Sequence, residues 1–247
     1  MNISTLLFDS VDSTNTVAAD HARQGAAEGL CIIAKRQTAG RGRHGRTWAS
    51  DPDSGLYFSI ILRPKLDPRH LTLITLVAGI AAHDVLKDYG LEPDIKWVND
   101  ILIGDDKICG ILAESIETKT GLAVILGVGI NLTSSSFPEE LAATATSIEV
   151  ETGQRITPEE IAQRLTPYLG YFYNLLCGPD GPREIIEHWR QRSTYFSGKD
   201  VRVATSGEVF EGVTDGLEPN GALRVKLADG SVRIVDSADV TRLRAKH

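Results

Sequence analysis

The sequence predicts an α/β fold, in which a mixed sheet has helices on one face and a small SH3-like β-barrel follows at the C-terminus. Three observations support this prediction. Near-continuous apolar runs, such as residues 56–62 and 122–132, are typical of strands buried on both faces. A long amphipathic segment, residues 71–89, lies between them with the period of a helix. From about residue 197 the chain changes to short alternating strands separated by turn residues.

Length and composition set the limits of this fold. The chain has 247 residues and a net charge of -7, with 42% hydrophobic and 24% charged residues. We expect one large domain over residues 1–196 and a small one over residues 197–247. The longest apolar runs are far shorter than the roughly 20 residues of a membrane-spanning helix. No secretory signal is visible in residues 1–5, so we expect no membrane attachment. The acidic balance argues against general nucleic-acid binding.

The three cysteines carry little chemistry on their own. Cys31, Cys109 and Cys177 are widely spaced, lie in apolar segments and form no zinc-binding pattern. A reduced cytoplasmic compartment is the simple interpretation, and we assign no metal ligands.

The first elements carry a polar segment at a helix start. Residues 4–9 are expected to form a strand and residues 17–22 a helix, with Asp12-Ser13-Thr14-Asn15 between them. Ser13 or Thr14 is a plausible N-cap for this helix. Hydroxyl and amide groups at a helix N-terminus also suit a polar ligand. Both roles remain open on these residues alone.

The next segment concentrates glycine and arginine. After a strand over residues 30–35 and Gln37 comes Gly40-Arg41-Gly42-Arg43-His44-Gly45-Arg46-Thr47-Trp48. Glycine lets the backbone approach a ligand closely, and guanidinium groups match phosphate or carboxylate oxygens two at a time. The composition therefore predicts a loop that binds a small polyanion, although a solvated basic loop has the same composition.

Two phosphate-binding motifs match this loop in part. Gly40, Gly42 and Gly45 fit a G-x-G-x-x-G fingerprint, and a Walker A loop would differ only by Lys in place of Arg46. Both motifs require a helix directly afterwards, which Pro52 and the glycine at 55 would break. We interpret the segment as an anion-binding loop between two strands.

The middle of the chain is expected to form a helix and a hairpin. Residues 71–89 form the helix, and its His83 is expected at the surface. A strand over residues 95–103, a tight acidic turn and a return strand over residues 107–114 form the hairpin. Lys107 begins the return strand, where most lysines are merely exposed.

The remaining segments complete the predicted fold. The strand over residues 122–132 holds glycines that suggest a close ligand or backbone approach, and residues 133–147 are a long loop that could act as a lid. Further helices are expected over residues 158–176 and 183–196, and the C-terminal strands over residues 201–203, 207–213, 222–225 and 232–235.

Several of these segments, in this order and at this spacing, resemble the biotin–protein ligase family. They are Asp12-Ser13-Thr14-Asn15, Gln37, the loop from Gly40 to Arg46 with Trp48, Lys96-Trp97-Val98-Asn99-Asp100, Lys107 with Gly110-Ile111-Leu112, and Gly127-Val128-Gly129-Ile130-Asn131-Leu132. The resemblance covers essentially the whole chain. Val98 stands where the family usually has Pro, and we expect a small effect on the backbone. The catalytic part begins at residue 1, so we expect no DNA-binding helices of the repressor-type members.

The resemblance implies a reaction of two steps. Biotin and ATP form biotinyl-5′-AMP and pyrophosphate, with Mg²⁺ on the phosphates. A lysine of a biotin carboxyl carrier domain, part of a biotin-dependent carboxylase, then takes the biotinyl group. The resemblance also leaves the enzyme either a monomer or a homodimer, and an unpaired edge strand would permit a dimer.

The resemblance further assigns the site residues. Biotin or adenylate contacts fall to Ser13, Thr14, Asn15, Gln37, Gly40, Arg41, Gly42, Arg43, Lys107, Gly110 and Gly129, and nucleotide contacts to Arg46, Trp48, Asn99 and Asn131. Three residues are expected to be catalytic. Arg43 retains the adenylate, Lys107 acts at the reacting carboxyl and α-phosphate, and Asp100 assists or orients the incoming lysine. An Asp at a hairpin start could equally cap backbone groups.

Two alternatives remain. A lipoate or octanoate ligase or acyltransferase of the same fold would use a related carrier lysine, and a cysteine-dependent version would need Cys109 as a thiolate. A nucleic-acid or effector-binding module could use the basic loop, but it would need more basic and aromatic surface than this chain has.

Overall fold

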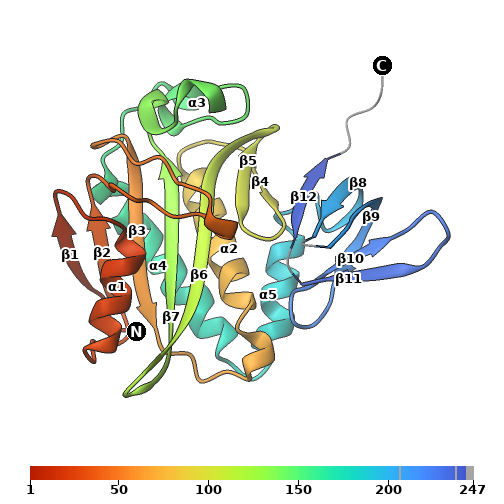
Figure 1. The fold of residues 1–247 in the computed structure, drawn as a ribbon, viewed down its shortest axis with the longest axis horizontal. Helices are drawn as coiled ribbons and strands as arrows, with labels where there is room; N and C mark the ends of the chain where they lie inside the picture. The colour runs from red at the N-terminus through yellow and green to blue at the C-terminus, as the bar shows by residue number, and fades with distance from the viewer. Residues whose placement is uncertain (206, 237, 243–247) are drawn as a thin grey trace.

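The computed structural model describes residues 1–205, 207–236 and 238–242, in two parts that Figure 1 shows side by side. The first part contains β1 (Ser4–Phe8), α1 (Thr14–Arg23), β2 (Leu30–Ala34), β3 (Gly55–Leu62), α2 (Leu73–Asp88), β4 (Pro93–Lys96), β5 (Asp100–Ile103), β6 (Asp106–Thr118), β7 (Gly121–Asn131), α3 (Ile148–Thr152), α4 (Pro158–Leu176) and α5 (Gly181–Arg190). The second contains β8 (Ser197–Ala204), β9 (Val209–Leu217), β10 (Leu223–Lys226), β11 (Val232–Val235) and β12 (Asp239–Arg242). Residues 243–247 of the predicted C-terminal domain lie outside the described residues.

The large sheet is mixed, as predicted. Its seven strands have the order β1-β2-β3-β7-β6-β5-β4. β1 and β2 are parallel, and the other neighbouring strands are antiparallel. The five C-terminal strands form a separate antiparallel sheet in the order β11-β10-β9-β8-β12. The predicted α/β class is therefore confirmed.

The helices pack on both faces of the large sheet, so the prediction of helices on one face alone is wrong. α2 and α4 cover one face, α5 packs on these two helices, and together they form the main core with strand residues such as Ile60, Val124 and Leu126. α1 covers part of the other face, where it packs on Ile61 and Ile125. Figure 1 shows α1 and α4 on opposite sides of the sheet. Because α1 is short, the rest of its face stays open beyond the N-terminus of this helix.

The segment Pro68–Asp88, which includes α2, is long and apolar enough to cross a membrane by length and composition alone. However, 67% of its most apolar window is buried inside the protein. Its apolar residues therefore belong to the core between the sheet and α4.

The chain reverses within the segment predicted as one strand over residues 95–103, so that prediction is wrong. β4 ends at Lys96, the peptide between Trp97 and Val98 is cis, and β5 starts at Asp100. The Trp97 side chain is buried and its Nε1 donates to the carbonyl oxygen of Gly221 at 2.9 Å. This reversal pairs Lys96 with Asp100 across the two strands.

Helix α2 carries a partly buried ion pair that the sequence did not predict. His83, expected at the surface, is 6% exposed, and its Nδ1 lies 2.9 Å from Asp84 Oδ1. Arg192, just after α5, donates from Nε and Nη2 to the two carboxylate oxygens of Asp84 at 2.6 and 2.9 Å. A bidentate pair of this kind fixes both distance and orientation. It ties α2 to the segment that leads into the C-terminal strands.

We predict that Asp84→Asn lowers the free energy of unfolding by about 1–3 kcal/mol at neutral pH, because it removes a charge-assisted pair. Burial opposes ionisation of Asp84, but the hydrogen bonds from His83 and Arg192 outweigh it and lower the pKa of the carboxyl group from its ordinary 3.8. A carboxyl group whose pKa is lower in the folded state stabilises the protein at any pH above its pKa in the unfolded state. This stabilisation is lost as the pH falls through the pKa of the folded state. The difference in free energy of unfolding between wild type and variant, measured by urea unfolding, should therefore be largest above pH 5 and should decrease below pH 4. A difference in free energy of unfolding that increases on acidification would contradict this prediction.

Candidate active site

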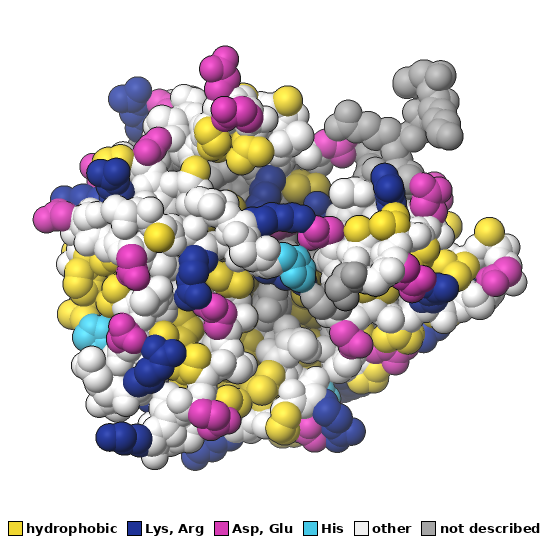
Figure 2. Space-filling model, viewed as in Figure 1, with side chains coloured by type: hydrophobic (Ala, Val, Ile, Leu, Met, Phe, Trp, Pro, Cys, Tyr) yellow, Lys and Arg dark blue, Asp and Glu magenta, His cyan; other side chains and the backbone are white. Residues whose placement is uncertain are grey.

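A cavity of about 280 Å³ opens on the sheet face that carries α1. It is bounded by the start of α1, the glycine and arginine loop, strands β6 and β7, residues of the 133–147 loop and Asp239 of β12. Figure 2 shows Lys and Arg side chains gathered around a hollow near the middle of this face, where the main body meets the C-terminal strands. The cavity thus collects positive charge within an acidic protein.

The predicted site residues come together here from distant parts of the chain. Those that line the cavity are Ser13, Thr14, Asn15, Gln37, Arg41, Gly42, Arg43, Arg46, Trp48, Asn99, Asp100, Lys107, Gly110, Gly129 and Asn131. Gly40 is not among the lining residues. A Cβ atom at Gly40 would lie 2.3 Å from the Trp48 carbonyl oxygen and 2.7 Å from Ser50 Oγ. The structure places Gly40 where the two ends of the loop approach each other.

Trp48 lies against the glycines of the cavity floor. A Cβ atom at Gly129 would be 2.5 Å from Trp48 Cε2, and one at Gly110 would be 2.7 Å from Trp48 Cζ3. The two glycines face each other on β6 and β7. Lys107 Nζ lies 5.3 Å from the centroid of the indole ring, within the range of a cation–π contact. The glycines therefore make room for the indole, and Lys107 lies over it.

One end of the cavity is cationic and surrounds Asp100. Lys107 Nζ lies 2.6 Å from Asp100 Oδ1, and Lys96 Nζ lies 3.5 Å from Oδ2. Burial disfavours the ionised form, but the positive charges of Lys107 and Lys96 outweigh burial and lower the pKa of Asp100. Asp100 is therefore an ionised carboxylate that the two lysines hold, and a weak proton acceptor while both stay in place.

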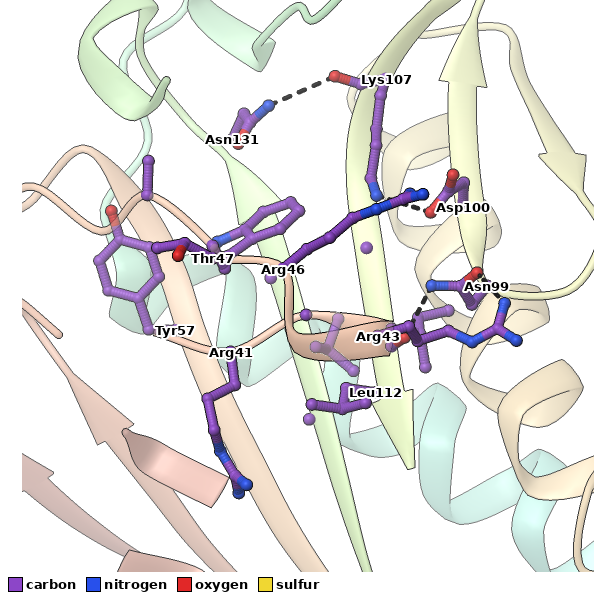
Figure 3. Close-up of a pocket in the computed structure, with 18 of the residues that line it drawn as sticks. Arg41, Arg43, Arg46, Thr47, Tyr57, Asn99, Asp100, Lys107, Leu112 and Asn131 are labelled. Atoms are coloured by element: carbon purple, nitrogen blue, oxygen red, sulfur yellow. Dashed lines mark hydrogen bonds and ion pairs between the residues drawn. The ribbon is translucent and has the colours of Figure 1, made fainter. Parts of the chain in front are cut away.

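The three loop arginines point in different directions. Arg41 Nη2 donates to Glu114 Oε2 at 2.8 Å, and Arg46 forms an ion pair with Asp239. Figure 3 shows Arg46 extending across the cavity toward Lys107 and Asp100, while Arg41 points to the opposite side.

Arg43 links the loop to the C-terminal part of the protein. Its Nη1 donates to Asn99 Oδ1 at 3.1 Å and reaches the carbonyl oxygen of Ala238 at 3.5 Å. Asn99 in turn donates from Nδ2 to the carbonyl oxygen of Ile111 at 3.0 Å. With the pair between Arg46 and Asp239, these contacts join the loop to the start of β12.

The other end of the cavity, around the start of α1, is polar and has no net charge, because its one guanidinium, that of Arg41, is paired with Glu114. Gln37 Oε1 accepts hydrogen bonds from the Thr14 backbone N–H at 2.8 Å and from Thr14 Oγ1 at 3.2 Å. Ser59 is fully buried, and its Oγ lies 2.7 Å from Thr14 Oγ1 and 2.6 Å from Asn15 Oδ1. Ser13 precedes the helix and makes no side-chain cap to it. Together these groups offer both donors and acceptors to a neutral polar ligand.

Asn131 connects β7 to the 133–147 loop. Its Nδ2 donates to the carbonyl oxygens of Thr146 at 2.9 Å and Lys107 at 3.3 Å. Phe137 and Leu141 of the loop line the cavity. In this structure the Asn131 amide therefore holds the end of the loop beside Lys107.

Several residues of the site were not predicted from the sequence. Ser59 and Glu114 contact predicted residues, and Asp239, Phe137 and Leu141 line the cavity. Ser59 could have been found from the sequence, because it is a polar residue within an apolar strand that is buried on both faces, and a buried hydroxyl needs a hydrogen-bond partner. No local pattern could pair Asp239 with Arg46, since the two lie 193 positions apart.

No metal site is built from protein side chains within the described parts of the chain. No group of three or more His, Cys, Asp or Glu side chains is placed there to hold an ion. The carboxylate nearest the cationic end, Asp100, is already paired with Lys107 and Lys96.

Two family models and several known proteins match this chain. The model of the Biotin/lipoate A/B protein ligase family matches residues 7–131, and that of the Biotin protein ligase C terminal domain matches residues 196–242. The bifunctional ligase/repressor BirA of Bacillus spizizenii is 33% identical over 244 residues, which cover 94% of this chain and 72% of that protein. The biotin--[acetyl-CoA-carboxylase] ligase of Paracoccus denitrificans is 30% identical over 239 residues, which cover 93% of this chain and 96% of that protein.

A solved structure shows the same fold. The biotin protein ligase from Aquifex aeolicus in complex with biotin and ATP superposes with a TM-score of 0.83 at 26% identity. The match covers 97% of this chain and 99% of the other. The family model spans the strands that form the cavity, and the second model spans the strands that contribute Asp239. The chain therefore belongs to the biotin/lipoate A/B protein ligase family.

Proposed function

We infer that the chain is a biotin–protein ligase, which joins biotin and ATP into biotinyl-5′-AMP and transfers biotin to a lysine of a biotin carboxyl carrier domain. One observation carries this inference: a single cavity has a polar end without net charge at α1, where Arg41 is paired with Glu114, and a cationic end at Lys107. Biotin has a neutral ureido ring at one end and a carboxylate at the other, so its two ends match those of the cavity. The likeness to biotin protein ligases over both parts of the chain supports the same substrate.

The first step brings two anions together. The biotin carboxylate attacks the α-phosphorus of ATP, a new P–O bond forms, and pyrophosphate leaves. We propose that Lys107 lies between the carboxylate and the α-phosphate, and that Arg46 and Arg43 neutralise the phosphate oxygens. Fixed cations in a site that excludes water stabilise developing charge more strongly than in water. Trp48, Asn99 and Asn131 would then border the nucleotide.

The polar end would hold the ureido ring. Ureido N–H groups need acceptors and the ureido oxygen needs donors. We propose that Thr14, Asn15 and Gln37 supply them, beside Ser13, with Arg41 and the backbone of Gly42 along the same wall. Gly110 and Gly129 would serve indirectly by leaving room for Trp48.

The second step uses the acceptor lysine. Its amine attacks the carbonyl carbon of the mixed anhydride, an amide forms, AMP leaves with the bonding electron pair, and the ammonium proton passes to solvent or a nearby base. Asp100 is ionised and lies 2.6 Å from Lys107. We propose that Asp100 orients the incoming ammonium, since its lowered pKa makes it a poor general base.

Other parts of the proposal rest on this reaction. We propose that Mg²⁺ enters on the phosphates of ATP, since Mg²⁺ usually binds substrate phosphates together with only one or two carboxylates, and no step here depends on it. The reaction belongs in the cytoplasm, where the carrier domains of biotin-dependent carboxylases are made. The unit that binds biotin and ATP spans residues 1–196 and the C-terminal unit residues 197–247. Monomer and homodimer both remain compatible with the exposed edge strand β1.

The cysteine-dependent alternative predicts a reactive thiol that this chain does not offer at the site. Cys109 is fully buried in β6, and burial raises the pKa of its thiol well above the ordinary value. A thiol held in its neutral form is a poor nucleophile. We predict that Cys109→Ala keeps the rate of biotin transfer within about threefold of wild type, measured with biotin, ATP and a carrier domain. Loss of transfer with adenylate formation intact would favour an acyl-cysteine route instead.

The proposed function is tested by pyrophosphate release with ATP and Mg²⁺, comparing biotin, lipoate and octanoate. Release with biotin alone is the expected result. Pyrophosphate release with lipoate or octanoate in place of biotin would be compatible with the fold but would show that the assigned substrate is wrong.

A further inference from the structure

Glu114 joins two residues of the polar end without lining the cavity itself. Its Oε2 accepts a hydrogen bond from Asn15 Nδ2 at 2.7 Å and another from Arg41 Nη2 at 2.8 Å. On β6 it follows Gly110 and Leu112, which line the cavity, and alternation along the strand puts its side chain on the same face. One carboxylate therefore contacts a residue of α1 and a residue of the glycine and arginine loop.

The Asn15 amide has protein partners on both its oxygen and its nitrogen, and Glu114 supplies the shortest contact of its NH₂ group. Ser59 Oγ lies 2.6 Å from Oδ1, while Nδ2 lies 2.7 Å from Glu114 and 3.4 Å from the Leu112 carbonyl oxygen. Asn15 is 4% exposed, and a Cβ atom at Gly127 would lie 2.3 Å from its Oδ1. A packed amide with distinct partners for its oxygen and nitrogen has one orientation.

The charge of Glu114 also matters for the shape of the field in the cavity. Its carboxylate compensates Arg41, so this pair adds no net charge beside Asn15. A net positive charge stays at the opposite end, where Lys107 and Lys96 share the one carboxylate of Asp100, and Figure 3 shows Lys107 on the other side of the cavity from Arg41. A ligand with a neutral head and an anionic tail has one favourable direction in such a field.

We propose that Glu114 is a positioning residue that sets the direction in which biotin binds, by fixing the Asn15 amide and compensating Arg41. The proposal deepens the proposed function and rests on it. Glu114 acts through Asn15 and Arg41, so it governs biotin and leaves ATP, at the Lys107 end, unaffected.

The test is steady-state pyrophosphate release with Glu114→Ala, Glu114→Gln and the control Glu117→Ala, an exposed position further along β6. We expect Glu114→Ala to raise KM for biotin at least about tenfold, with KM for ATP within twofold of wild type. The KM of Glu114→Gln for biotin should lie between those of wild type and Glu114→Ala, because its amide oxygen still accepts a hydrogen bond from Asn15 although the charge is gone. Glu117→Ala should match wild type.

Two results would overturn the proposal. One is a KM for biotin in Glu114→Ala within twofold of the Glu117→Ala value. The other is an equal rise of KM for biotin and ATP together with a lower melting temperature, which would mark a merely structural role. Wild-type release with biotin is measured first and tests the proposed function alone, so failure there is distinct from failure of the Glu114 variants.

Discussion

Lys107→Met should lower kcat for biotin-dependent pyrophosphate release by about 10²–10³-fold, the cost of removing one fixed charge-stabilising group from an active site. Methionine keeps an unbranched apolar stem beside Trp48 but removes the ammonium that lies 2.6 Å from Asp100 and 5.3 Å from the indole centroid. The loss should fall mainly on kcat, because Lys107 is proposed to act on charge that is shared between the carboxylate and the α-phosphate as they react.

The matched control is Lys119→Met, an exposed position at the hairpin between β6 and β7. It removes the same charge from the same hairpin at the end away from the cavity, and it should leave kcat unchanged. Rapid-quench measurement of the adenylate separates the first step from the second. If Lys107→Met formed the adenylate at the wild-type rate, Lys107 would have no part in adenylation.

Gly129→Ala should reduce kcat/KM for both biotin and ATP by about 10²-fold, the scale of a misplacement of about 1 Å in a catalytic arrangement. A Cβ atom here would lie 2.5 Å from Trp48 Cε2, closer than packed carbon atoms allow, so the indole must move. The ring can move only away from the sheet, toward the cavity and toward Lys107, which lies over it. One methyl group would therefore displace two residues of the site.

Gly170→Ala is the control for this substitution. Gly170 lies in α4, and a Cβ atom there would have no heavy atom within 4 Å. Alanine in a helix is more favourable than glycine by about 0.5–1 kcal/mol, so this variant should be active and at least as stable as wild type. Tryptophan fluorescence reports the expected movement of the indole. Full activity of Gly129→Ala would mean that the position of Trp48 is irrelevant to the reaction.

Local patterns accounted for many elements and for the position of the glycine and arginine loop between two strands. The helix over residues 158–176 was predicted with the bounds it has, because Thr157 caps it and Pro158 fixes its first turn. The glycine and arginine loop was predicted to bind anions because flexibility and charge stand next to each other in the sequence. Arg41, Arg43 and Arg46 all line the cavity, and anion binding by the loop stays a prediction.

Long-range pairing could not be predicted in the same way. The contact between Asn15 and Glu114 spans 99 positions and depends on how β6 and α1 meet across the sheet. The reversal at residues 97–99 carries no glycine, so the turn was missed and with it the pairing of Lys96 with Asp100. Gly40 was assigned to the ligand by the family resemblance, whereas a Cβ atom there would meet Trp48 and Ser50, so the glycine lets the two ends of the loop approach each other.

The intact mass of a biotin carboxyl carrier domain, recorded after incubation with this chain, ATP, Mg²⁺ and an equal mixture of biotin and lipoate, tests the central claim most directly. The account predicts a gain of one biotinyl group on one lysine, dependent on ATP and absent with Lys107→Met. A lipoyl group in its place, or no modification while the wild-type chain is folded, would contradict the claim that this cavity joins biotin to ATP.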